Sequence, residues 1–207
     1  MLFAAPTLQG QDTGRVISID SLQLTSLGVD VGGVRPAQSE PAPLLGVSAD
    51  YGPLSKTLRL RLEASYWQSR LTDGVVKHYT DILSRVITDP SRDDVIVPSR
   101  VSLYDVTFGV GVRWQPLQAT VVQPFAGGGV AMHVINAEGP LINGTFVERL
   151  FDSFSTGFFA ESGVLVKPVK EFGVEGRVRG DMVNGFRSVS ARIGGVYYFS
   201  PLRRNEP

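Results

Sequence analysis

Few side chains in this sequence are suited to acid–base or nucleophilic chemistry. The 207 residues include two histidines, His78 and His133, and no cysteine, which excludes a thiolate metal site, a cysteine nucleophile and a disulfide framework. The residue two positions after His133 on the same face is Ile135, not a nucleophile. We therefore interpret His133 as a polar strand residue and His78 as a solvated helix residue. We expect no catalytic residue, no cofactor and no metal.

The spacing of the charged residues is more informative than the histidines, because in several segments a charged residue occupies every second position. They comprise Asp30, Asp50, Glu63, Asp105, Glu161, Glu175 and Asp181, together with Arg59, Arg61, Arg113, Lys167, Arg177, Arg179 and Arg192. Carboxylates such as Glu63 and Glu161 are suited to general acid–base catalysis, but arginines accompany them throughout. An unpaired charge in a narrow interior is costly. The balance of acids and bases therefore predicts a structural ion-pair network.

The segments that carry these charges alternate strictly between apolar and polar side chains. In residues 57–67, Leu-Arg-Leu-Arg-Leu-Glu places three leucines on one face and three charged residues on the other. Alternation with a period of two predicts a β-strand with one apolar face. A length of 11 residues also matches the roughly 9–11 residues that a strand needs to cross a bilayer.

Eight such strands are expected along the chain. They cover residues 27–34, 44–51, 57–67, 101–114, 125–134, 156–167, 172–182 and 189–199. Short connections with proline fall at 52–55, 115–118 and 168–171, longer polar ones at 35–43, 69–100 and 136–153, and Asn184-Gly185 predicts a tight hairpin. Short turns at one end and long loops at the other are typical of outer-membrane barrels. The predicted fold is an all-β, eight-stranded antiparallel up-and-down transmembrane β-barrel.

The direction of the apolar face decides between a membrane barrel and a soluble one. The predicted apolar faces contain no Asp, Glu, Lys or Arg and have aromatic residues at their ends, as expected for contact with lipid. Much of the glycine lies on the polar face, which suits the limited space inside a narrow barrel. We therefore place the polar face in a largely closed lumen. A soluble lipocalin-like ligand-binding barrel, with Leu58, Leu60 and Leu62 inside, stays open as an alternative.

Composition limits the partners. Lys+Arg and Asp+Glu number 20 each, so the chain has no net charge and no basic field to attract nucleic acid. No stretch approaches 18 consecutive apolar residues, which excludes a transmembrane helix. The expected surroundings are a lipid bilayer.

The longest loop has a different period. Apolar residues at helical spacing follow Thr72 and Asp73, either of which can cap a helix, and precede Pro90: Val75, Val76, Tyr79, Ile82, Leu83, Val86 and Ile87. We expect an amphipathic helix within the loop of residues 69–100. It either packs on the end of the barrel to shield apolar residues or binds a partner protein or the membrane surface.

The closing strand, Arg192-Ile-Gly-Gly-Val-Tyr-Tyr-Phe199, resembles the C-terminal signal of outer-membrane β-barrel proteins, with Arg192, Gly194, Tyr197 and Phe199 at the signal positions. The chain is similar to the eight-stranded OmpA/OmpX/OmpW-type barrels. The resemblance implies that the barrel-assembly machinery recognises this signal during insertion. Members of the family commonly end at the aromatic residue, whereas residues 200–207 follow here.

The expected organisation is an N-terminal tail or signal-peptide remnant (1–21), a barrel domain (22–199) and a C-terminal tail (200–207). The expected function is that of a non-catalytic structural, adhesive or partner-binding component of a bacterial outer membrane. A lipid-modifying barrel enzyme, with His133 beside a serine and a carboxylate, is the alternative from another class.

Overall fold

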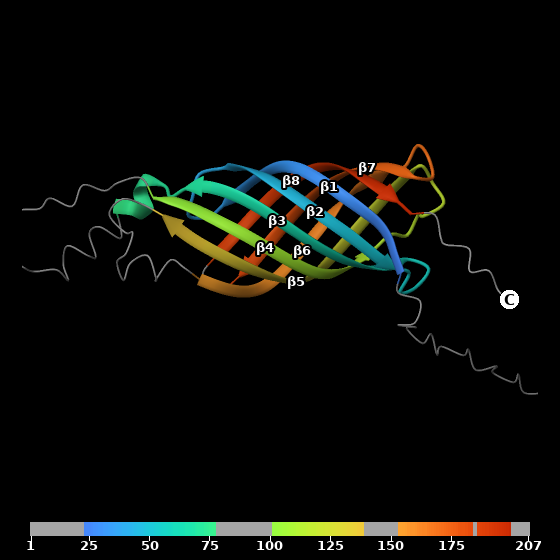
Figure 1. Cartoon of the computed structure of the whole chain (residues 1–207), viewed down its shortest axis with the longest axis horizontal. Helices are drawn as coiled ribbons and strands as arrows, with labels where there is room; N and C mark the ends of the chain where they lie inside the picture. The colour runs from blue at the N-terminus through green and yellow to red at the C-terminus, as the bar shows by residue number, and fades with distance from the viewer. Residues whose placement is uncertain (1–22, 78–100, 139–152, 184–185, 200–207) are drawn as a thin grey trace, which may run out of the picture.

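Eight antiparallel strands close on themselves to form a barrel (Figure 1). The computed structural model describes residues 23–77, 101–138, 153–183 and 186–199. The strands are β1 (Gln23–Pro36), β2 (Ala42–Gly52), β3 (Leu58–Arg70), β4 (Ser102–Trp114), β5 (Val122–Glu138), β6 (Ser153–Val166), β7 (Phe172–Val183) and β8 (Phe186–Tyr198). Each strand overlaps one alternating segment of the sequence, and the predicted up-and-down fold is confirmed.

Pairing of the first strand with the last closes the barrel. β1 pairs with β2 on one side and with β8 on the other, where Val31 lies opposite Ile193. Closure gives the backbone groups of every strand a partner, which a bilayer interior requires. All strands except β4 are longer than the alternating segments, with 11 residues in β2 and 17 in β5, because backbone pairing continues beyond them.

The two ends of the barrel differ. At the end that we call inner, β1 begins, β8 ends, and short connections join β2 to β3, β4 to β5 and β6 to β7 (Figure 1). The strand ends at the opposite, outer end include those that the long connections, residues 71–101 and 139–152, join. The predicted loop over 35–43 is only residues 37–41, because β1 and β2 stay paired as far as Val34 and Ala42. Residues 184–185, between β7 and β8, lie outside the described residues.

The predicted loop helix begins where expected. Residues 73–77 are α-helical, and the amides of Val75 and Val76 donate to the carbonyl of Thr72. The remainder of the predicted helix, from His78 to Pro90, lies outside the described residues. No described helix is long and apolar enough to cross a lipid bilayer.

The apolar faces point outward and the charged faces inward. Val29 is 66% exposed and Phe158 70%, whereas Asp105 and Arg113 are at most 1% exposed. The soluble-barrel alternative, which requires the apolar face inside, is therefore not favoured.

Charged side chains on the outward face of the described strands lie only near the outer end. They are Arg35, Arg70, Glu138 and Arg187. All four fall outside the alternating segments, so the predicted charge-free surface holds for those segments and ends where the strands extend beyond them.

Candidate functional site

Arginine and carboxylate side chains from opposite strands meet in the centre of the lumen. β3 and β7 are four strands apart and face each other across the barrel. Arg61 of β3 donates from Nη2 to Glu175 of β7 at 3.1 Å and from Nη1 to Asp50 of β2 at 3.2 Å. Glu63, also on β3, accepts from Nη1 of Arg177 on β7 at 2.8 Å. These contacts bridge the full width of the barrel.

Two arginines are each shared between carboxylates. Arg113 of β4 donates to Glu175 at 2.5 Å and to Glu161 of β6 at 3.1 Å. Arg177 donates to Glu161 at 3.1 Å and to Asp30 of β1 at 2.8 Å. All five residues are at most 7% exposed. Because buried charges are tolerated when they are paired and hydrogen-bonded, this sharing compensates the buried charges.

Arg179 extends the network toward the outer end. Its Nε and Nη2 donate to Asp181 at 2.9 and 2.6 Å, and its Nη1 contacts Glu63. The guanidinium lies 3.8 Å from the ring centroid of Phe159. Gly111 leaves room for that ring, since a Cβ at this position would lie 2.6 Å from Phe159 Cζ. A lumen glycine is thus needed where an aromatic ring supports an arginine.

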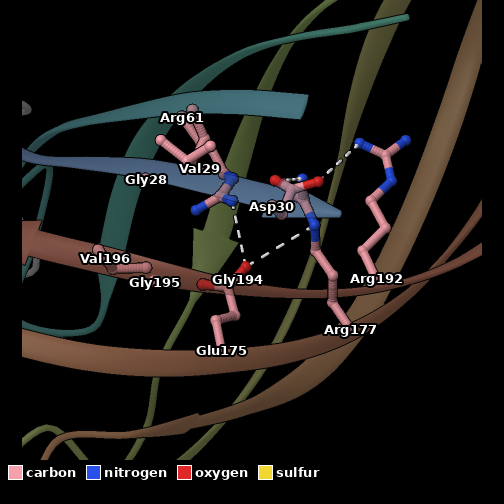
Figure 2. Close-up of a pocket in the computed structure, with 11 residues that line it drawn as sticks. Gly28, Val29, Asp30, Arg61, Glu175, Arg177, Arg192, Gly194, Gly195 and Val196 are labelled. Carbon is pink, nitrogen blue, oxygen red and sulfur yellow. Dashed lines mark hydrogen bonds and ion pairs between the residues drawn. The ribbon is translucent and has the colours of Figure 1, made fainter. Parts of the chain in front are cut away.

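A cavity of about 10 Å³ lies beside the network (Figure 2). Four of the residues that line it, each from a different strand, have a buried polar atom without a hydrogen-bond partner in the described part of the chain: Asp30 Oδ1, Arg61 Nε, Arg177 Nε and Arg192 Nη1. Arg192 Nη1 lies 3.7 Å from Asp30 Oδ1. A space of this size accommodates about one water molecule. Three N–H donors and one carboxylate oxygen can hydrogen-bond to such a water molecule.

His133 lies on β5 in a separate polar cluster. Its Nδ1 is 2.9 Å from Asp105 Oδ2 and 3.2 Å from Thr107 Oγ1, and its Nε2 is 3.8 Å from Asp181 Oδ1. Asp105 also accepts from Trp67 Nε1 at 2.9 Å. His133 is 1% exposed and has no serine at hydrogen-bond distance among the described residues. This arrangement holds the imidazole in place between Asp105, Thr107 and Asp181.

Apolar side chains fill the lumen at its outer end. They are Val34, Ala42, Leu44, Trp67, Leu71, Val101, Leu103, Ile135, Ala137, Val183 and Phe186. Trp67 stacks on Phe186 with ring centroids 6.1 Å apart, and Val75 and Val76 of the helix pack against the cluster. The sequence pattern did not predict this cluster. It could have been found from apolar residues such as Leu103 and Ile135, which lie on the polar face near the outer strand ends.

Arg59 and Lys167 form no ion pair with a described residue, unlike the predicted network. Arg59 donates to Gln118 at 3.4 Å and to Thr25 at 3.5 Å. Lys167, just beyond β6, places Nζ 3.6 Å from the ring centroid of Tyr198. Partial burial and then the charge of Arg59 lower the pKa of Lys167. Both side chains lie at the inner mouth and are only partly buried, so they do not need a carboxylate partner.

Solved structures share this architecture. The chain matches the crystal structure of Neisserial surface protein A with a TM-score of 0.55 and 16% identity, over 86% of this chain and 99% of that one. It matches the N-terminal barrel domain of Pseudomonas aeruginosa OprF with a TM-score of 0.50 and 16% identity, over 85% and 98% of the two chains. This is the fold of an eight-stranded outer-membrane β-barrel. No protein-family model matches the sequence, and a search of curated proteins finds no significant match.

The signal positions of this outer-membrane barrel fold lie along and just beyond β8. Gly194 lies opposite Asp30, whose Cβ would be 2.6 Å from a Cβ at that position. Arg192 faces the lumen, whereas Tyr197 and Phe199 point outward at the inner end with ring centroids 5.5 Å apart. Each residue therefore has a place in the folded barrel. Recognition of this C-terminal signal by the barrel-assembly machinery stays a prediction.

Proposed function

We propose that this protein is an integral barrel of a bacterial outer membrane that acts without catalysis, as a structural, adhesive or partner-binding component. The observation that carries the proposal is the filled lumen: ion pairs occupy its centre and the apolar cluster its outer end. A lumen closed in this way leaves the loops and the outer surface to interact with other molecules.

The outward surface supports a membrane location. In β8, ten residue steps separate Arg187 from Tyr197. At about 3.3 Å per step and a strand tilt of about 40°, they span roughly 25 Å, the height of the apolar band in outer-membrane barrels. The long connections of such barrels face the outside of the cell, so residues 71–101 and 139–152 lie there in this proposal.

The burial of His133 supports a role without catalysis. A lipid-modifying barrel enzyme needs an accessible base beside a nucleophile. Here the imidazole is 1% exposed and lies between Asp105 and Asp181, below the apolar cluster. This burial argues against the enzyme alternative, because a substrate cannot reach the imidazole.

The loop of residues 69–100 is the proposed site for a protein partner. Its described helical residues contact the apolar cluster through Val75 and Val76, while Asp73 and Lys77 are exposed. This packing supports the shielding role for the first helical turn. The described part of the loop therefore lies at the outer end of the barrel, where a partner has access.

The proposal is tested by fractionating cells and by comparing gel mobility in mild detergent with and without boiling. We expect the protein in the outer-membrane fraction with a boiling-dependent shift, and conductance near the bilayer background in planar membranes. Recovery as a detergent-free soluble monomer, or a stable conductance of the porin class, would contradict the proposal. Replacing residues 78–100 by a short linker is expected to leave the shift intact and abolish partner binding or cell adhesion.

A further inference from the structure

Two arginines lie side by side on the outward surface near the outer end. Arg35 of β1 lies opposite Val189 of β8, so Arg187, two residues from Val189, is its diagonal neighbour. Both side chains are exposed. Neither is within 4 Å of a carboxylate among the described residues, in contrast to the paired arginines of the lumen. Two adjacent guanidinium groups without a carboxylate partner attract an anionic ligand.

A hollow of about 530 Å³ adjoins Arg35. The residues that line it come from β1, β2, β8 and the connection between β1 and β2: Gly33, Val34, Arg35, Pro41, Ala42, Pro43, Val189, Ser190 and Ala191. The register explains it, because Gly33 lies opposite Pro43 on β2 and opposite Ala191 on β8. Three small or compact outward residues therefore form one row across three strands.

The next row toward the inner end consists of larger residues. Val31 lies opposite Leu45 on β2 and Ile193 on β8, and these side chains are 51–60% exposed. This row lies two residues nearer the inner end than Gly33. On the outer side Arg35 lines the hollow, and Arg187 is the diagonal neighbour of Arg35. We call this hollow and its two arginines the β1–β8 notch.

We propose that the β1–β8 notch binds an acidic lipid of the outer leaflet. The two guanidinium groups bind its phosphate, and the row of Pro43, Gly33 and Ala191 receives the start of an acyl chain. Arginine suits this role because its planar fork of donors matches phosphate oxygens. Basic side chains at the level of the head groups attract anionic lipids. The inference rests on the proposed membrane location.

The test uses folded, purified full-length chain in a neutral detergent. Native mass spectrometry measures binding of dioleoyl phosphatidic acid and, separately, dioleoyl phosphatidylcholine. We expect preferential binding of phosphatidic acid. The variant Arg35→Gln/Arg187→Gln is expected to weaken it at least about tenfold. Arg70→Gln, a matched charge removal at the outer end of β3, is expected to leave it unchanged.

A second variant fills the hollow without altering charge. A Cβ at Gly33 would have Ala42 O at 3.8 Å as its nearest atom, so Gly33→Leu is tolerated by the backbone while its side chain occupies the hollow. We expect this variant to keep its boiling-dependent gel shift and to lose most of its phosphatidic acid binding. It tests the site even if the double arginine variant does not fold.

Three results would overturn the proposal: equal binding of the two lipids, equal loss in Arg70→Gln and in the double variant, or full binding by Gly33→Leu. These results differ from failure of the proposed function. That function fails if the chain does not fractionate with outer membranes, whereas the notch is measured on the folded barrel in detergent.

Discussion

Arg61 on β3 donates a 3.1 Å hydrogen bond to Glu175 on β7, on the opposite side of the barrel and 114 residues further along the chain. Glu175 also accepts from Arg113, so one carboxylate bridges two buried guanidinium groups. The closed lumen depends on this convergence.

Replacing Glu175 with Gln should therefore be strongly destabilising. Removing one partner of a buried ion pair typically costs 3–5 kcal/mol, since the other charge stays buried. Urea unfolding in lipid vesicles, followed by the boiling-dependent gel shift, measures the change in free energy. Glu171→Gln, an exposed inner turn position, is the control. Equal stability of the two variants would show that the network does not stabilise the fold.

Lumen and surface glycines should respond differently to a larger side chain. A Cβ at Gly111 would lie 2.6 Å from Phe159 Cζ and 2.7 Å from Gly128 O, whereas a Cβ at the outward Gly176 has no atom within 4 Å. We expect Gly111→Val to lose about 1–3 kcal/mol from overpacking and Gly176→Val to change little. The same vesicle unfolding assay measures both. A greater loss for Gly176→Val would place the lumen on the wrong face.

A charge on the outward surface tests the membrane position of the barrel. Val47, near the middle of β2, is 54% exposed. Val47→Arg should reduce the folding free energy in vesicles by about 2–4 kcal/mol, while Gln68→Arg, near the outer end of β3, should cost about 0–1 kcal/mol. Equal effects of the two substitutions would contradict the assigned apolar band.

The small lumen cavity should contain one ordered water. Asp30 Oδ1 and the unpartnered nitrogens of Arg61, Arg177 and Arg192 supply an acceptor and three donors. A high-resolution crystal structure should show density within hydrogen-bond distance of Asp30 Oδ1 and of at least one arginine nitrogen. If side chains fill the space in that structure, the prediction fails.

Phe199→Ala should reduce assembly in cells more than stability. The Phe199 amide donates to the Thr25 carbonyl at 2.9 Å, a bond that alanine keeps. We expect less heat-modifiable barrel in membranes, yet normal refolding of the purified chain into vesicles. Phe158→Ala, an outward aromatic outside the signal, is the matched control. Unchanged membrane yield in Phe199→Ala would remove the assembly role.

The number of strands and the face that each strand turns outward can be predicted from the sequence alone. Successive side chains of a strand point to opposite faces, so the positions of charged and apolar residues show which face is buried. Segments such as 57–67 therefore predicted both the strand and the lumen positions of Arg61 and Glu63.

Which side chains meet in the lumen depends on how the strands pair and close. Arg61 reaches Glu175, and Pro43, Gly33 and Ala191 form one row, because strand register and barrel closure align residues that are distant in the chain. Local alternation carries no information on register between strands. The apolar cluster around Trp67 likewise depends on closure, because its members come from different strands and meet only when the barrel closes around them.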